Sequence, residues 1–321
     1  MRRGFALVLT LLMMTGCTGA DTQTARASCS ALPIATMPVD IRGNMLFVQA
    51  VIAGEPVTLL ADTGAERTLL TETAVRNLDL TRDPLHATRT YGIGTPTVTR
   101  DAKLPDGIRL GGVQLPLHRV SVGGFAISPV AGTVADGLLG ADVLMGFDVD
   151  LDLPARRITL YRPRGACPFA PPPWGQPYTA IAGIVSKDDR LLVPFVLDGV
   201  PGMGVLDSGA QLSSISRAMA ERTGLPEASL RADRTVVAHG AAPEEITAWI
   251  HRFRELRVGP AVIEAPTLPV VTMTDGMGDA LIGADFLRGR RVWLSFTTAQ
   301  VFVTPLARSP MIAVTRSEVV Q

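Results

Sequence analysis

The chain has 321 residues, of which 47% are hydrophobic and 19% are charged. This length and composition allow two lobes that each bury a hydrophobic core. Thirty basic residues balance thirty acidic ones without forming a basic block, so nothing in the sequence indicates a nucleic-acid-binding surface. We therefore expect no nucleic-acid partner and favour a small or peptide-like one.

The first seventeen residues have the pattern of an export signal. Two arginines near the start precede an apolar stretch at residues 5–14 that is too short to remain as a membrane-spanning helix. Residues 14–17, Met-Thr-Gly-Cys, resemble a bacterial lipobox, in which the cysteine is lipidated and becomes the first mature residue. This pattern predicts a signal peptide over residues 1–16 and lipidation of Cys17. An ordinary signal peptide cleaved near Ala20 is the alternative.

The lipoprotein pattern also predicts a location. Thr18 follows the expected lipid anchor, and the absence of an aspartate at this position is associated with delivery to the outer membrane. We expect a lipidated tether over residues 17–38 and a periplasm-facing lipoprotein of the cell envelope, on the outer membrane. Contact with the membrane is expected only through this N-terminal anchor.

Two further cysteines lie before and between the expected lobes. An even pair in an exported protein favours a disulfide between Cys29 and Cys167, whereas two free thiols are the alternative. The bridge would tie the tether to residues 163–178. This segment carries six prolines, which disfavour regular structure, and it is expected to link the two lobes.

A β-hairpin is predicted twice, and each copy leads to an aspartate. Runs rich in valine and leucine at residues 46–53 and 57–61 are separated by Gly-Glu-Pro. An offset of 145 residues aligns residues 46–80 with residues 191–225 without a gap, and nine positions are identical. The second strand of each hairpin therefore carries an aspartate into a glycine turn.

The glycine turns belong to a long internal repeat. Residues 62–65, Asp-Thr-Gly-Ala, return as residues 207–210, Asp-Ser-Gly-Ala, and residues 137–144 return as residues 280–287. The repeated unit is about 125 residues long. One Asp-Thr-Gly or Asp-Ser-Gly alone would be weak evidence, because such tripeptides are common in turns. Two copies at matched positions in a repeat are strong evidence for a paired site.

The remaining elements are mostly strands. Thr71 and Ser216 occupy matching positions and are predicted to be the N-caps of short helices over residues 72–78 and 217–223. Another matched pair of strands begins near residues 108 and 256, and most of the other segments alternate between strand and turn patterns. The expected fold class is therefore all-β with short helices.

These motifs together resemble the aspartic peptidases. Asp-Thr-Gly-Ala is similar to the retroviral type, and two lobes in one chain are similar to the pepsin type. The resemblance covers nearly the whole mature chain and implies two similar retropepsin-like β-barrel lobes, at residues 39–162 and 179–306, with a tail at residues 307–321. Residues 138–140 and 281–283 are similar to the family's apolar-apolar-Gly element, which packs beside the catalytic loop.

The resemblance also implies a flap, which is a hairpin that closes over the substrate. The segment Thr-Tyr-Gly-Ile-Gly-Thr at residues 90–95 is similar to the tip of the pepsin flap, although a glycine-rich hairpin alone is usually just a turn. An offset of 148 residues aligns residues 91–92 with residues 239–240, which predicts a second flap without the tyrosine. The expected substrate-binding residues of the flaps are Tyr91, Gly92, Ile93, Gly94, His239 and Gly240.

The implied activity is that of an aspartic endopeptidase, with Asp62 and Asp207 as the catalytic dyad. Two adjacent carboxyls share one proton, so one can activate water while the other donates to the scissile carbonyl. In the family, the Thr or Ser hydroxyl after each aspartate forms a hydrogen bond across the lobe interface, and the glycine that follows allows close approach of the backbone. Dyad support is expected from Thr63, Gly64, Ser208 and Gly209.

This chemistry needs no metal or cofactor, and the four histidines are too scattered to suggest a metal site. Because one chain supplies both aspartates, we expect a monomer that acts on a peptide or protein substrate. The alternative is a non-catalytic peptide-binding or envelope-scaffold lipoprotein on the same fold. A duplicated barrel whose aspartates are only turn residues would belong to that class.

Overall fold

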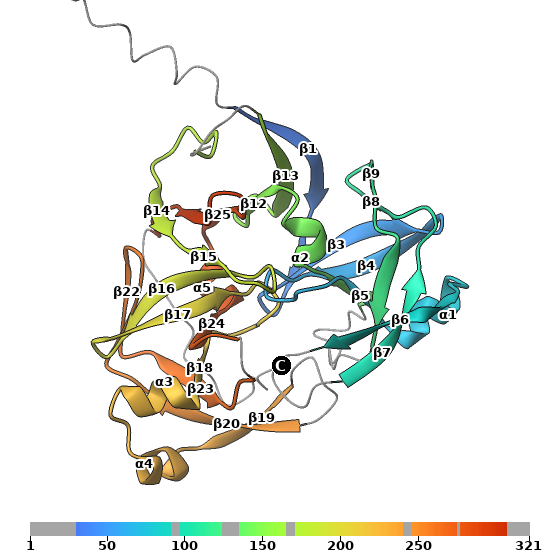
Figure 1. The fold of residues 1–321 in the computed structure, drawn as a ribbon. Coiled ribbons are helices and arrows are strands. Elements are labelled where there is room, and N and C mark those ends of the chain that lie inside the picture. The colour runs from blue at the N-terminus through green and yellow to red at the C-terminus, as the bar shows by residue number, and fades with distance from the viewer. Residues whose placement is uncertain are drawn as a thin grey trace, which may run out of the picture.

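The structure is a computed structural model that describes residues 30–90, 97–123, 135–164, 171–239, 245–274 and 277–306. It consists of two β-rich lobes and a third sheet that joins them (Figure 1). The helices in the described ranges are all short. They are α1 (Glu72–Asn77), α2 (Ala141–Leu144), α3 (Arg217–Arg222), α4 (Glu227–Ala232) and α5 (Ala284–Leu287).

The N-terminal lobe is built on a ten-stranded sheet with the order β6-β7-β10-β5-β11-β4-β3-β8-β9, to which β2 is added by pairing with β3. Its strands are β2 (Asp40–Arg42), β3 (Met45–Ile52), β4 (Glu55–Ala61), β5 (Leu69–Leu70), β6 (Arg82–Thr90), β7 (Thr97–Lys103), β8 (Ile108–Leu110), β9 (Val113–Leu115), β10 (Arg119–Val122) and β11 (Gly137–Leu139). The strands β4 and β11 are parallel neighbours near the middle of this sheet.

The C-terminal lobe repeats this topology strand for strand, with the order β19-β20-β23-β18-β24-β17-β16-β21-β22 and with β15 paired to β16. Its strands are β15 (Ile184–Val185), β16 (Leu191–Leu197), β17 (Val200–Leu206), β18 (Ser214–Ser216), β19 (Thr235–His239), β20 (Glu245–Arg252), β21 (Glu255–Val258), β22 (Ala261–Glu264), β23 (Thr267–Val271) and β24 (Ala280–Ile282). The internal repeat of the sequence is therefore a repeat of the fold.

The third sheet has six strands in the order β1-β13-β12-β25-β26-β14, three from each half of the chain. These are β1 (Ser30–Pro38), β12 (Asp148–Asp152), β13 (Arg157–Arg164), β14 (Thr179–Ala182), β25 (Arg291–Ser295) and β26 (Gln300–Val303). The lobes meet in the middle of this sheet, where β12 pairs with β25.

This joining sheet changes two of the expected boundaries. Residues 30–38, expected as the end of the tether, form β1 and pair with β13, and β13 extends to Arg164, inside the expected linker. The physical reason is burial, because Ala35 and Met37 of β1 are 3% and 1% exposed. Burial of apolar side chains favours the strand over a solvated tether.

One hydrophobic cluster runs through both lobes and the joining sheet. It contains Leu46 of the first hairpin and Leu191 of the second, both fully buried, together with Val149 and Leu294 of the joining sheet. The lobes therefore share a core, which holds their central strands in a fixed relation.

The predicted hairpins and helix caps are confirmed. β3 and β4 form the first hairpin, and β16 and β17 form the second. The hydroxyl of Thr71 accepts a hydrogen bond from the amide of Ala74, and that of Ser216 accepts one from Met219, as N-caps do. The helices α1 and α3 that follow are each one residue shorter than expected.

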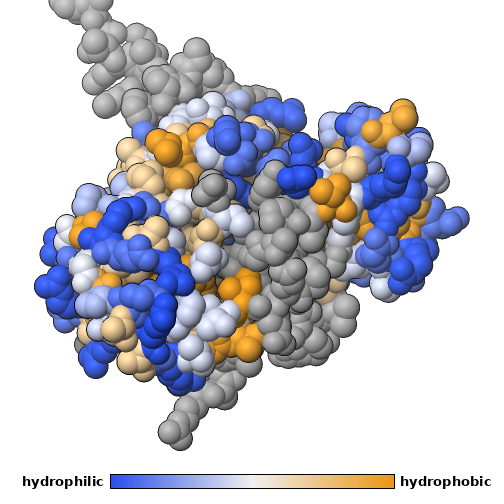
Figure 2. Space-filling view, turned by 60° about the horizontal axis from the view of Figure 1, so that its bottom comes forward, coloured by the Kyte–Doolittle hydropathy of each residue, from blue (hydrophilic) through white to orange (hydrophobic). Residues whose placement is uncertain are grey.

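On the face that Figure 2 shows, both lobes carry many hydrophilic side chains, and hydrophobic side chains are visible on both lobes next to the space between them. Among the described residues, no helix has the length and apolar character needed to cross a membrane.

Candidate active site

Each predicted catalytic aspartate follows a central strand of its lobe. Asp62 comes after β4, and its amide donates to the carbonyl of Leu139 in β11 at 3.0 Å. Asp207 comes after β17, and its amide donates to Ile282 in β24 at 2.9 Å. Because both strand pairs are parallel, the two loops leave their sheets at corresponding points.

Each loop folds back on its own aspartate. Oδ1 of Asp62 accepts hydrogen bonds from the amides of Gly64 and Ala65, both at 2.9 Å. Oδ1 of Asp207 accepts from the two corresponding amides, at 2.8 and 3.0 Å. These bonds fix the orientation of both carboxyls and favour their charged forms.

Thr63 and Ser208 connect the two loops. The amide of Thr63 donates to Oγ of Ser208 at 3.1 Å, and the amide of Ser208 donates to Oγ1 of Thr63 at 3.0 Å. The hydroxyls then donate across the interface, from Thr63 to the carbonyl of Leu206 at 2.6 Å and from Ser208 to that of Ala61 at 2.7 Å. Both side chains are buried. Each such bond contributes about 1 kcal/mol.

The two glycines place each carboxyl against the opposite loop. A Cβ atom added to Gly64 would lie 2.3 Å from Cγ of Asp207, and one added to Gly209 would lie 2.3 Å from Cγ of Asp62. No side chain fits in either space. The structure therefore brings together all six residues predicted for the dyad and its support, which are Asp62, Thr63, Gly64, Asp207, Ser208 and Gly209.

Burial raises the pKa of both aspartates. The pKa of Asp62 lies well above its usual value because of burial, the nearby charge of Asp207 and a hydrogen bond with Asp207, while two loop amides act in the opposite direction. Burial also raises the pKa of Asp207, against the loop amides, the hydrogen bond with Asp62 and the charge of Arg190. Two carboxyls coupled in this way can share one proton and titrate as a pair. Such a pair can act as base and acid together.

A second pair of carboxylates supports the loops from behind, and the sequence did not predict this role. Oδ1 of Asp142 accepts from the amide and the hydroxyl of Thr68 at 2.8 and 2.7 Å, and Oδ1 of Asp285 accepts from Ser213 at the same two distances. Burial raises the pKa of both aspartates. The available signal was a hydroxyl residue six positions after each predicted catalytic aspartate.

Two turns, one in each lobe, also form a hydrogen bond with the opposite lobe, and neither contact was predicted. Nε of Arg190, from the turn before β16, donates to the carbonyl of Gly64 at 2.8 Å. Nδ2 of Asn44, from the matching turn before β3, donates to the carbonyl of Gln211 at 3.5 Å. The repeat gave no signal for the arginine, because the residue that aligns with it is Met45.

Other predicted site residues lie outside the described ranges. These are Tyr91, Gly92, Ile93, Gly94, Gly240, Cys17, Cys29 and Cys167. His239 is the last residue of β19, which pairs with β20 as β6 pairs with β7. Each lobe thus carries paired strands on both sides of its predicted flap residues. Within the described ranges, no group of three or more His, Cys, Asp or Glu residues is placed to hold a metal ion.

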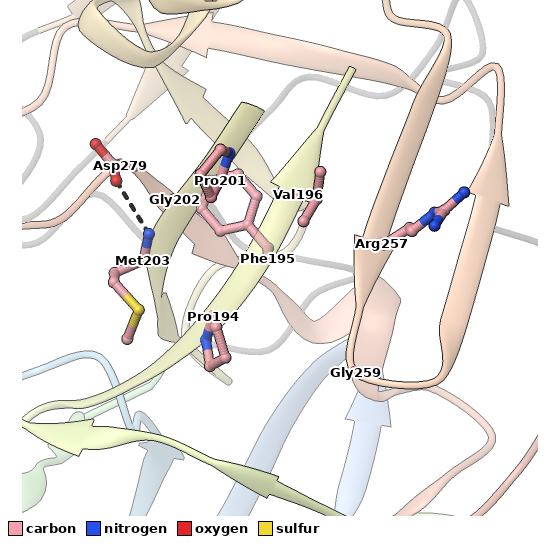
Figure 3. A pocket seen from close by; sticks show the side chains of 9 residues that line it. All are labelled: Pro194, Phe195, Val196, Pro201, Gly202, Met203, Arg257, Gly259 and Asp279. Carbon is pink, nitrogen blue, oxygen red and sulfur yellow. Dashed lines mark hydrogen bonds between the residues drawn. The ribbon is translucent and has the colours of Figure 1, made fainter. Parts of the chain in front are cut away.

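A separate hollow of about 540 Å³ lies on the C-terminal lobe, between β16, β17 and the turn after β21 (Figure 3). Its lining is mainly apolar and includes none of the dyad residues. The charged groups at this hollow already have partners, because Asp279 accepts from the amide of Met203 and pairs with Arg222, and Arg257 pairs with Glu255. The dyad is therefore the stronger candidate for the active site.

Comparison with known proteins identifies the family of the chain. No curated protein matches the sequence significantly. Among solved structures, an aspartic proteinase from Irpex lacteus has 11% sequence identity and a TM-score of 0.49, with 85% of this chain and 97% of that chain covered. The family model described as aspartyl protease matches residues 48–148 and 193–286, one segment in each lobe and more than half of the chain. The chain therefore belongs to the aspartyl protease family, in a form with two lobes.

Proposed function

We propose that the chain is an aspartic endopeptidase. Asp62 and Asp207 are the catalytic pair that hydrolyses the peptide bonds of its substrate. The observation that carries the proposal is the pair of adjacent carboxyls with raised pKa values, each held by amides of its own loop and packed on a glycine of the other loop. Family membership supports the same class of reaction.

In the proposed mechanism, the ionised carboxyl takes a proton from water while the water oxygen attacks the carbonyl carbon of the peptide bond. The neutral carboxyl gives its proton to the carbonyl oxygen, and a tetrahedral diol forms. The C–N bond then breaks as the nitrogen takes a proton from the first carboxyl, while a diol hydroxyl returns one to the second. The pair ends with one proton, as it began.

A peptide-library digest tests the proposal. The protein from Ser30 onward should cleave peptides, and Asp62→Asn or Asp207→Asn should each lower kcat/KM by about a thousandfold or more, because one member of the acid-base pair is lost. Asp198→Asn is a matched control. Its carboxylate also fixes a turn, by accepting from the amides of Arg254 and Glu255 at 2.8 and 2.9 Å, but at the far end of the second hairpin.

Two results would contradict the proposal. One is turnover near the wild-type rate in either Asn variant of the dyad. The other is tight peptide binding without cleavage over the acidic and neutral pH range, which would favour the peptide-binding alternative.

We also propose that the protein is exported and anchored through a lipid on Cys17. The support is the sequence of residues 1–17, with its charged start, apolar stretch and lipobox-like end. Cys17→Ala should abolish fatty-acid labelling and release the protein from the membrane fraction, or leave it as an uncleaved precursor. A processed Cys17→Ala protein that still fractionates with membranes would overturn the anchor.

A disulfide between Cys29 and Cys167 is proposed on similar grounds. Ser30 pairs with Arg164 at the end of β1 and β13, so the two cysteines are one and three residues from a paired position. Peptide mapping without reduction should find them joined. Free thiols at both positions in exported protein would contradict the bridge.

A further inference from the structure

Arg190 is a buried cation in contact with the loop that carries Asp62. Its side chain is only 4% exposed, and its Nε donates to the carbonyl of Gly64 at 2.8 Å. Gly64 in turn packs against the carboxyl of Asp207, because a Cβ atom at Gly64 would lie 2.5 Å from either carboxyl oxygen. One residue of the N-terminal lobe therefore contacts both the guanidinium and the carboxyl of Asp207.

This contact breaks the two-fold symmetry of the site. In the N-terminal lobe, Met45, the first residue of β3, occupies the position that aligns with Arg190, and the bond to the opposite loop is made by the neutral amide of Asn44 in the turn before it. The hydrogen bonds from the loop amides and between Thr63 and Ser208 occur in both halves alike. The arginine is thus a charged group that only one half supplies.

We propose that Arg190 is a positioning residue that keeps the dyad in its singly ionised form, with the negative charge on Asp207 and the shared proton on Asp62. The proposal rests on the proposed function, since it assigns the base and the acid of that reaction. Asp207 would activate water, and Asp62 would donate to the scissile carbonyl.

The physical argument concerns a buried positive charge close to the carboxyl of Asp207. A buried cation acts on a nearby carboxyl with little screening. Burial raises the pKa of Asp207, and the charge of Arg190 acts against this rise. The position after each glycine is Ala65 or Ala210, which has no hydroxyl to donate to a carboxylate, so the cation adds to the stabilisation that the two loop amides give the anion.

Other charged groups on the neighbouring elements leave this asymmetry in place. Asp188 lies 3.7 Å from Nη1 of Arg190, but its carboxylate is 30% exposed and is screened by solvent. Asp142 and Asp285 occupy matching positions in the two halves, and both are bound by hydroxyls. Glu66 pairs with Arg67 in the exposed part of the loop.

The test combines a pH profile with a titration that needs no activity. Arg190→Met installs the residue that the other half carries, and Arg190→Lys keeps the charge. Arg290→Met is the control, since Arg290 is also buried but donates to the carbonyl of Phe286 in α5. We expect Arg190→Met to move the acidic limb of kcat/KM upward by about half a unit to one unit, because the anion loses a cation. Arg190→Lys and Arg290→Met should leave the limb in place.

Site-specific ¹³C titration of the aspartate carboxyls gives the second measurement. In the wild type, Asp207 should ionise at lower pH than Asp62, and in Arg190→Met the two should approach each other. Lower turnover in Arg190→Met with an unmoved acidic limb would show a merely structural role and overturn the proposal. So would ionisation of Asp62 before Asp207 in the wild type, which requires no variant to fold. If the wild type cleaves no peptide but titrates as expected, the proposed function fails and the assignment of the proton stands.

Discussion

At the scale of single residues, the site depends on two glycines, whose lack of a side chain leaves room for the opposite carboxyl. Gly64 and Gly209 allow each carboxyl to pack directly on the opposite loop, at a separation that no Cβ atom could share. The close approach of the loops, and not an unusual backbone angle, requires glycine at these positions. The geometry of the dyad is therefore sensitive to a single added methyl group.

We predict that Gly64→Ala and Gly209→Ala abolish turnover and lower the free energy of unfolding by about 1–3 kcal/mol, as overpacking does. Urea denaturation and peptide cleavage measure the two effects. Gly175→Ala is the control, because a Cβ atom there would meet nothing within 4 Å. Wild-type activity in either dyad variant would show that the loops can separate without loss of function.

The raised pKa of Asp62 also predicts a pH dependence of stability. The pKa of Asp62 is raised well above 3.8 in the folded protein. Below pH 3.8 the carboxyl is protonated in both folded and unfolded states, so no cost arises. As pH rises above this value, the unfolded chain releases the proton and the folded protein retains it, so folding becomes less favourable.

Asp62→Asn removes this cost and keeps a neutral side chain of similar shape. We therefore expect the variant to gain stability relative to the wild type as the pH is raised from about 3.5 to 7, by about 1.4 kcal/mol for each unit of pKa shift. Urea denaturation at several pH values measures the difference. A difference that stays constant with pH would mean that Asp62 is not the carboxyl that retains the proton.

At the scale of elements, the helices after the catalytic loops begin at defined side-chain caps. Thr71→Ala and Ser216→Ala should each lower the free energy of unfolding by about 1 kcal/mol, because an N-cap hydrogen bond is lost. The acidic limb of activity should not move. Thr73→Ala, at an exposed position in α1, should have little effect on unfolding. Equal losses at Thr71 and Thr73 would rule out the cap as the cause.

Elements that the repeat carries could be predicted from the sequence, whereas the joining sheet could not. The hairpins were visible because apolar runs flank a Gly-x-Pro turn in both copies, and Thr71 and Ser216 marked the helix starts. The strand β12 alternates aspartate with valine and leucine, which is a pattern typical of a half-solvated strand. Its partner β25 lies about 140 residues later, and no local signal connects the two.

Some parts of the candidate site could likewise be predicted from the sequence, and others could not. The dyad and the residues around it were predicted because the motif is repeated. The bonds from Thr68 to Asp142 and from Ser213 to Asp285 also occur twice, but their meaning requires the fold. Arg190 could not be predicted, because a contact made in only one half leaves no trace in a comparison of the halves.

At the scale of the whole molecule, one chain supplies both halves of the site and of the joining sheet. Each lobe contributes one aspartate, one partner of the bonds between Thr63 and Ser208, and three strands of the third sheet. Peptide-cleaving activity should therefore belong to the monomer, and specific activity should stay constant on dilution through the nanomolar range. Sedimentation velocity at the same concentrations provides the check. A fall in activity together with a fall in sedimentation coefficient would indicate a required dimer.

The pairing of β12 with β25 has a consequence for which strand can pair with the edge of the first lobe. The register places Asp150 opposite Trp293, its own counterpart at the offset of 143, so the two-fold axis of the repeat passes through this pair. Two copies of the first lobe could meet edge to edge in the same register, and each Asp150 would then face another Asp150. Like charges directly opposite one another destabilise a sheet. In the structure, β12 pairs instead with β25, which carries Arg291. Both Nε and Nη2 of Arg291 bind the carboxylate of Asp150. The acidic edge of the first lobe thus disfavours a neighbouring molecule and selects the second half of its own chain.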